Sequence, residues 1–108
     1  MVPYVKLQDL MEKETRTSYT LLDEKMGCVN GCRCGISIYR YDEYPGGSAH
    51  EDQEGFFVLE GRGLALIDGE ELEMEPGMAF MIPAGVEHTM KRAPGSEYCK
   101  VLWFHGAI

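Results

Sequence analysis

Residues 48–61 read SAHEDQEGFFVLEG, and residues 77–88 read GMAFMIPAGVEH. The first stretch places His50 and Glu54 at the start of a run whose side chains alternate between two faces, as in a β-strand. The second stretch is an apolar strand followed by a Pro-x-Gly-x-x-His turn that ends on His88. Because the two stretches lie far apart along the chain, only a closed fold brings these two imidazoles and one carboxylate together.

The two stretches resemble the two sequence motifs of the cupin superfamily. The first motif of that family has the form His-x-His-x3-Glu-x6-Gly, and the second has the form Gly-x5-Pro-x-Gly-x-x-His-x3-Asn. The positions that match are His50, Glu54, Gly61, Gly77, Pro83, Gly85 and His88. Two positions differ, because Ser48 stands in place of the first histidine and Arg92 stands in place of the asparagine.

The resemblance implies an all-β fold of the cupin type, a double-stranded β-helix or jelly-roll barrel formed by residues 35–108. Residues 1–34 lie outside the motifs. We expect them to supply a short helix, a strand and a cysteine-rich turn that pack on the barrel, so that the chain forms one domain overall. The resemblance leaves the activity open, because this fold hosts many unrelated functions.

The pattern of the remaining sequence agrees with this fold. Residues 5–14 carry apolar side chains at helical spacing and predict one short amphipathic helix, which we expect to cover one end of the barrel. Residues 17–22 and 35–41 favour extended structure, and Asp68 followed by Gly69 predicts a tight hairpin turn. Short alternating segments separated by turns are typical of a small barrel or jelly roll.

Composition and charge exclude several classes of protein. The chain has 108 residues, of which 44% are apolar and 26% are charged, as in an ordinary globular domain. Its net charge of −8 argues against nucleic acid or an anionic membrane as partner, because phosphate groups bind mainly to clustered Lys and Arg. The sequence shows no apolar run of membrane-spanning length and no secretory signal, so we expect a cytoplasmic protein.

Two imidazoles and one carboxylate form a ligand set that accepts divalent transition metals. The resemblance places His50, Glu54 and His88 at the family's ligand positions, so we predict that they hold one such metal. Iron, manganese, nickel and zinc all remain candidates. Three protein ligands leave coordination positions for water and substrate, which an enzyme requires and a closed structural site does not.

Three further residues bear on a fourth ligand. A serine hydroxyl is a poor ligand unless it is deprotonated, so with Ser48 the metal is held by three side chains plus water. Asp52 either replaces the lost ligand after a slip of the strand or faces solvent at the turn. His105 shares one face of the last strand with Trp103, and it is either an additional inward ligand or a strand-end residue near the surface.

A ligand pocket beside the metal needs an apolar wall. Tyr39, Phe56, Met90 and Trp103 are our candidates for this wall, and each of them equally suits a place in the core. Arg92 has the same parity as His88, so its guanidinium either looks into the barrel mouth or pairs with a surface acid. In the first case it would hold a substrate carboxylate or phosphate through two parallel hydrogen bonds.

Four cysteines form a second candidate site. Cys28, Cys32 and Cys34 crowd into one short segment, and Cys99 is distant along the chain. In a reducing compartment such thiols are more often metal ligands or free thiols than parts of a disulfide framework. One interpretation is a thiolate site completed by Cys99, and the other is a glycine-rich turn with incidental thiols.

Two functions therefore follow from the sequence. The first is a metal-binding cupin that binds or acts on a small organic or sugar-like acid inside the barrel. The second is a non-catalytic module that binds or senses a small molecule without a required metal, so whether the chain is an enzyme stays open. The family resemblance also implies a homodimer, and the outward parity of Phe57 and Leu59 fits a sheet face buried between two copies.

Overall fold

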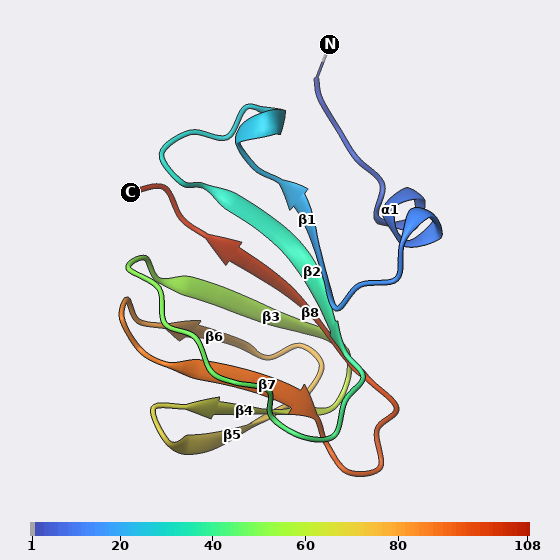
Figure 1. Ribbon diagram of the computed structural model, residues 1–108, viewed down its shortest axis with the longest axis vertical. Coiled ribbons are helices and arrows are strands. Elements are labelled where there is room, and N and C mark those ends of the chain that lie inside the picture. Colours follow the sequence, from blue (N-terminus) through green and yellow to red (C-terminus); the bar gives the residue numbers. More distant parts are fainter. Residues whose placement is uncertain (1) are drawn as a thin grey trace.

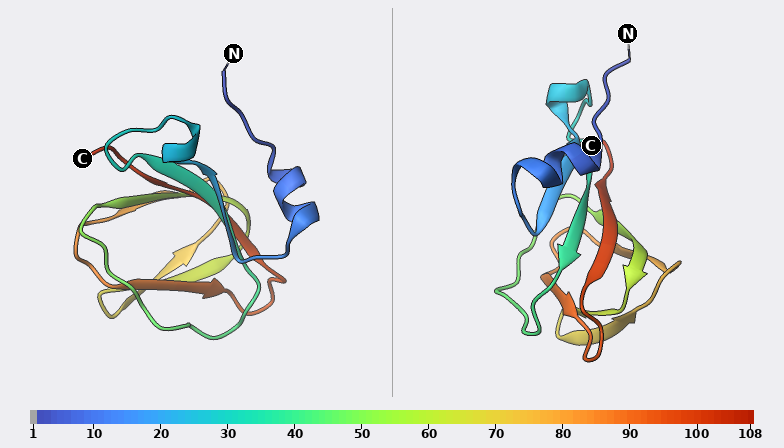
Figure 2. Two further views of the ribbon diagram at one scale, coloured as in Figure 1. Left: turned by 45° about the horizontal axis from the view of Figure 1, so that its top comes forward. Right: turned by 90° about the vertical axis from the view of Figure 1, so that its right-hand side faces the viewer.

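The computed structural model describes residues 2–108 as two antiparallel sheets that pack face to face (Figures 1 and 2). The larger sheet has the strand order β1-β2-β8-β3-β6, and the smaller sheet has the order β5-β4-β7. The strands are β1 (Ser18–Leu22), β2 (Arg33–Tyr39), β3 (Glu54–Gly61), β4 (Gly63–Ile67), β5 (Glu70–Met74), β6 (Ala79–Ile82), β7 (His88–Arg92) and β8 (Cys99–His105). The prediction of an all-β jelly roll with one short helix is confirmed.

The core lies between the two sheets. Along β3, Phe56 and Val58 are buried, whereas Phe57 and Leu59 are exposed on the outer side. This alternation confirms that Glu54, which has the same parity as Phe56, points into the barrel. The other buried residues of this core are Tyr39, Ala65, Met74, Ile82, Met90, Cys99, Val101 and Trp103.

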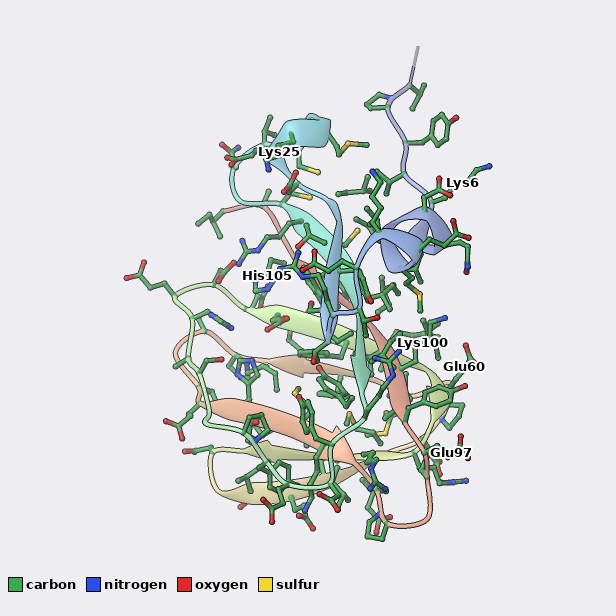
Figure 3. The ribbon with its side chains drawn as sticks, turned by 45° about the vertical axis from the view of Figure 1, so that its right-hand side comes forward. Lys6, Lys25, Glu60, Glu97, Lys100 and His105 are labelled. Carbon is green, nitrogen blue, oxygen red and sulfur yellow. The ribbon has the colours of Figure 1, made fainter. Side chains whose placement is uncertain are left out.

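Strand β8 lies in the middle of the larger sheet, between β2 and β3. Its register places the last residue, His105, directly opposite Arg33 on one side and Glu54 on the other. Its inward residues are buried, whereas Lys100 points outward and pairs with Glu60 at 3.3 Å (Figure 3). The end of β8 is therefore fixed beside the first residue of β3.

The predicted amphipathic helix is present as α1 (Leu7–Lys13), but its position differs from the expectation. It packs on the outer face of the larger sheet instead of covering an end of the barrel (Figure 1). A helix of this length is marginal in isolation, and its apolar residues gain stability from a second cluster. That cluster consists of Leu7, Leu10 and Met11 packed with Tyr19, Ile36 and Ile38.

Tyr19 also fixes the connection between α1 and β1. Its hydroxyl donates to the carbonyl oxygen of Glu14 at 3.0 Å and accepts from the backbone N–H of Arg16 at 2.8 Å. Strand β1 pairs with β2, so the N-terminal segment adds an edge strand to the larger sheet. Neither α1 nor the single turn η1 (Glu24–Met26) is long enough to cross a membrane, and residues 2–108 contain no longer helix.

The hairpin between β4 and β5 forms where the sequence predicts it. Asp68 and Gly69 both have positive φ, at 49° and 81°. This combination is the tight turn whose twist matches that of two antiparallel strands. It aligns β4 so that Ile67 lies opposite His88, the first residue of β7.

Gly35 provides a test of the close packing between β1, β2 and β8. A Cβ atom at this position would overlap the carbonyl oxygen of Tyr19 and the indole ring of Trp103. We expect Gly35→Ala to lower the free energy of unfolding by about 1–3 kcal/mol, because backbone on one side and a buried ring on the other limit relaxation. Urea denaturation measures the change, with Gly106→Ala as control because its added Cβ meets open space. Equal stability of the two variants would contradict this packing.

Candidate metal centre

Three potential ligands meet at one end of the barrel. Glu54 begins β3, His88 begins β7, and His50 lies in the connection between β2 and β3. Oxygen Oε1 of Glu54 lies 3.2 Å from Nε2 of His88 and 3.6 Å from Nε2 of His50. One ligand atom from each residue lies within 4.8 Å of the other two, which is a spacing that can hold a metal ion. Two imidazoles and a carboxylate also suit a divalent transition metal chemically.

Backbone hydrogen bonds hold the connecting loops in place around this cluster. Ser48 and His88 exchange two hydrogen bonds, with N–H to oxygen distances of 3.1 and 2.9 Å. The backbone N–H of Gly85 donates to the carbonyl oxygen of His50 at 2.6 Å. The Pro-x-Gly-x-x-His turn therefore clamps the loop that carries the other histidine. Ser48, which replaces a family histidine, contributes backbone pairing at the base of the site.

The two histidines differ in their exposure. The side chain of His88 is 6% exposed, whereas that of His50 is 35% exposed. The Nδ1–H of His88 donates to the carbonyl oxygen of Val86 at 3.0 Å, which leaves Nε2 directed toward Glu54. Such an outer hydrogen bond fixes the tautomer and the ring orientation of a metal-binding histidine. His50 forms the accessible side of the cluster.

The hydrogen bond with Glu54 raises the pKa of His88 above its ordinary value. Burial opposes this shift, and the Val86 carbonyl and the negative charge of Glu54 add to it. Without a metal, the proton on His88 therefore pairs with the carboxylate. A metal ion would compete with that proton for Nε2.

His105 lies on the inner side of this cluster. It is buried, and its Nε2 lies 3.3 Å from Oε2 of Glu54 while its Nδ1 lies 2.9 Å from Oδ2 of Asp52. The alternative that His105 lies near the surface is therefore wrong. So is the alternative that Asp52 faces solvent, because its side chain is 13% exposed and pairs with His105 and, at 3.7 Å, with Arg33. The sequence offered no signal for the role of Arg33.

A cavity of about 240 Å³ lies against the cluster. Its walls include three of the predicted pocket residues, Tyr39, Phe56 and Met90. Burial raises the pKa of the Tyr39 hydroxyl, so this group stays a neutral hydrogen-bond donor. The remaining lining residues are Pro45, Gly46, Ser48, His50, Glu54, His88 and Thr89.

Two predicted pocket residues lie elsewhere. Trp103 packs in the core beneath His105, with ring centroids 5.8 Å apart, and its indole N–H donates to Ser18. Arg92 takes the surface role instead of entering the barrel mouth. Its guanidinium donates to the carbonyl oxygens of Arg40 and Ser96 and lies 3.6 Å from Asp42.

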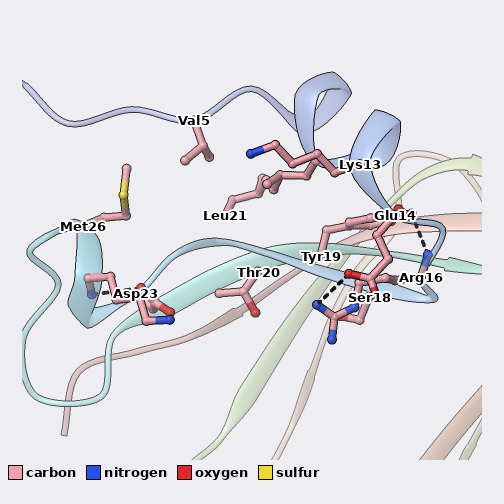
Figure 4. A pocket seen from close by; sticks show the side chains of 12 residues that line it. Val5, Lys13, Glu14, Arg16, Ser18, Tyr19, Thr20, Leu21, Asp23 and Met26 are labelled. Atoms are coloured by element: carbon pink, nitrogen blue, oxygen red, sulfur yellow. Dashed lines mark hydrogen bonds and ion pairs between the residues drawn. The ribbon is translucent and has the colours of Figure 1, made fainter.

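A larger groove of about 490 Å³ lies on the other side of the sheet, between α1, β1 and η1 (Figure 4). It contains no imidazole, and its charged side chains have both signs. Its lining includes Lys13, Arg16 and Lys25 as well as Glu14 and Asp23, and Arg16 lies 4.0 Å from Glu14. These side chains therefore do not favour one chemical class of ligand.

The structure separates the four cysteines. Cys99 is buried and pairs with Tyr39, whereas Cys34 pairs with Phe104, which lies five residues after Cys99 along β8. A separation of five strand residues is about 16 Å, so Cys99 cannot complete a thiolate site with the other three. All four are free thiols. Burial raises the pKa of Cys99 to about 11, and partial burial with the neighbouring Cys32 raises the pKa of Cys28.

The comparisons with known proteins agree with this architecture. The family model described as a cupin domain matches residues 40–105, which is more than half of the chain. This protein belongs to the cupin family. The match covers all three candidate ligands. No protein with curated annotation matches the chain in sequence.

Solved structures share the fold at low sequence identity. The polyketide cyclase RemF from Streptomyces resistomycificus is 24% identical with a TM-score of 0.71, over 82% of this chain and 62% of that one. The hydroxypropylphosphonic acid epoxidase from S. wedmorenis is 18% identical with a TM-score of 0.69, over 81% of this chain and 48% of that one. A complex of Fe(II) HppE with substrate is 18% identical with a TM-score of 0.72, over 82% and 48%. This cupin spans about half the length of most of these proteins.

The pairing of His88 with Glu54 predicts how the metal-free protein responds to pH. A histidine whose pKa is raised by folding adds stability that is fully present below its ordinary pKa of 6.5 and is lost as the pH rises through the raised value. We therefore expect His88→Gln to destabilise the chelator-treated protein most at pH 5.5–6 and progressively less above pH 7. Thermal melting of parent and variant across this range measures the difference. A difference that grows with pH would contradict the assignment.

Proposed function

We propose that this cupin holds one divalent transition metal on His50, Glu54 and His88 and binds a small organic or sugar-like acid beside it. The observation that carries the proposal is the meeting of two imidazoles and one carboxylate from three separate segments, within 4.8 Å, next to a cavity. Acidic side chains that cluster on a protein surface can come together without closure of a barrel. Here the closure itself assembles the donor set.

The walls of the cavity support the choice of ligand. Phe56 and Met90 give it an apolar side, and Tyr39 and Thr89 add hydroxyl groups. Its volume suits a small molecule. When bound, the metal supplies Lewis-acid or redox chemistry at its open coordination positions and attracts an anionic group of the ligand. The residues of this chain orient that ligand and exclude water from its apolar side.

Iron, manganese, nickel and zinc all accept this donor set. Structures of HppE with Fe(II) and with Co(II) share the fold, so iron is a natural first metal to test. Ser48 favours the second candidate function, a non-catalytic binding or sensing module, because it removes one family ligand. A metal held by three side chains keeps more open positions for a chelating ligand. The two candidate functions differ in whether the ligand is turned over and in whether a metal is required.

Metal content is the first test of the proposal. Protein purified without chelator or affinity tag is expected to contain about one equivalent of a transition metal, because the three ligand atoms form one site. The double variant His50→Ala, His88→Ala should lose it, as measured by plasma mass spectrometry. The control is Glu51→Gln, which changes an exposed carboxylate in the same loop. Metal that survives the double substitution, or a parent that takes up none, would overturn the proposal.

The metal-loaded protein then separates the two functions. Isothermal titration with hydroxy acids and sugar acids should detect a ligand that binds only with metal present. Turnover of that ligand, tested with and without air, identifies an enzyme. Binding without turnover identifies the sensing module. Ligand binding that is as tight in the metal-free protein would overturn the first function and favour the second, the binding module without a required metal.

We also propose that two copies of the chain associate through the outer face of the larger sheet. Phe57, Leu59, Met81 and Phe104 are exposed and come from the neighbouring strands β3, β6 and β8. The register places Met81 and Phe104 on either side of Gly55. Helix α1 lies over the part of this face formed by β1 and β2 (Figure 2). A contiguous apolar surface of this kind on a globular protein marks an interface.

Light scattering tests this interface. The parent is expected at about twice its chain mass of 12.1 kDa, and Phe57→Lys combined with Met81→Lys should return it to the monomer mass, because two charges would be buried without partners. Val29→Lys is the control, since Val29 is also an exposed apolar residue but lies in the turn before β2. A parent that runs as a monomer at all concentrations would contradict the proposal.

A further inference from the structure

The Glu54 carboxylate is shared between two sets of partners. Oxygen Oε1 lies against His50 and His88, at 3.6 and 3.2 Å, and belongs to the candidate metal centre. Oxygen Oε2 points the other way and lies 3.3 Å from Nε2 of His105. A metal at the centre would therefore meet only one oxygen of this carboxylate while His105 keeps its position.

His105 is itself fixed from its other side. Its Nδ1 lies 2.9 Å from Asp52, and Arg33 lies 3.7 Å from the same carboxylate oxygen. Arg33 also lies 3.3 Å from Nδ1, but a guanidinium only donates hydrogen bonds. The shorter contact therefore makes Asp52 the acceptor of the Nδ1–H and leaves Arg33 as the ion-pair partner of Asp52. Because Nε2 faces a second carboxylate oxygen, the ring donates to both carboxylates in its doubly protonated form.

The ring of His105 has little freedom to turn. It is 4% exposed, and its centroid lies 5.8 Å from the ring of Trp103 and 5.6 Å from the ring of His50, both in edge contacts. The strand register adds a backbone constraint, because His105 pairs with Glu54 on one side and with Arg33 on the other. Its two nitrogens consequently stay directed at the two carboxylates.

We propose that His105 is the positioning residue of the metal centre, which holds Oε2 of Glu54 and so keeps this glutamate a ligand through Oε1 alone. Asp52 and Arg33 hold His105 in turn. The inference rests on the proposed metal site and deepens it. If both oxygens of Glu54 bound the metal, they would occupy two of its coordination positions. With Oε1 alone as ligand, one of these positions stays free for the bound acid.

Cobalt(II) provides the test, because its affinity and its visible spectrum both report on the ligands. Outer partners of metal ligands typically change metal affinity by about 10- to 100-fold when they are removed. We expect a loss of this size for His105→Leu in a competition titration with a chromogenic chelator, together with a changed cobalt spectrum. His105→Gln should recover part of the affinity, because its amide can donate to Oε2.

Two further variants separate positioning from damage to the fold. Val101→Ala removes a buried side chain from the same face of β8 without touching the cluster, and it should leave the cobalt affinity and spectrum unchanged. Asp52→Asn should weaken binding less than His105→Leu does, and combining the two should add no further loss, because Asp52 acts through His105.

The outcomes distinguish the two proposals. If the parent binds no cobalt, both the proposed metal site and the proposed role of His105 are overturned. If the parent binds cobalt and His105→Leu binds it equally well with the same spectrum, the metal site stands and the positioning role is overturned. A loss in His105→Gln as large as in His105→Leu also overturns it, since the ring would then be a ligand itself.

Discussion

The Glu54 carboxylate contacts three imidazoles, and the closed barrel brings these three side chains to it from separate segments of the chain. His50 comes from a loop, His88 from the smaller sheet and His105 from the neighbouring strand of the larger sheet. A buried carboxylate is costly unless it is paired and hydrogen-bonded. The two sheets therefore have to close with these partners in place, and the stability of the closed barrel and the geometry of the site depend on the same contacts.

The pairing of β8 with both β2 and β3 determines which side chains meet. A shift of one residue would turn His105 and Trp103 outward and bring Lys100 and Phe104 into the core, because side chains alternate along a strand. The charge of Lys100 opposes that shift, because its ammonium group would be buried in the core. The same register that buries Val101 thus brings His105 to Glu54, so core packing positions the chemistry.

Much of this fold follows from local sequence signals. The strand alternation around Glu54, the hairpin at Asp68 and the turn that leads to His88 each depend on residues close together in the chain, and each forms as predicted. The position of α1 did not follow. Its helical periodicity predicts which face is apolar, but the partner of that face is set by Tyr19, Ile36 and Ile38, which only the folded sheet brings together.

The sequence by itself determined the barrel and its three candidate ligands, because the spacing of His50, Glu54 and His88 around apolar strands carries the family pattern. Tertiary structure alone decided the surroundings of these ligands. It placed His105 and Asp52 behind Glu54, turned Arg92 to the surface and separated Cys99 from the cysteine turn. The physical reason is that pairing partners across a sheet and between sheets are distant in sequence, so no local pattern specifies them.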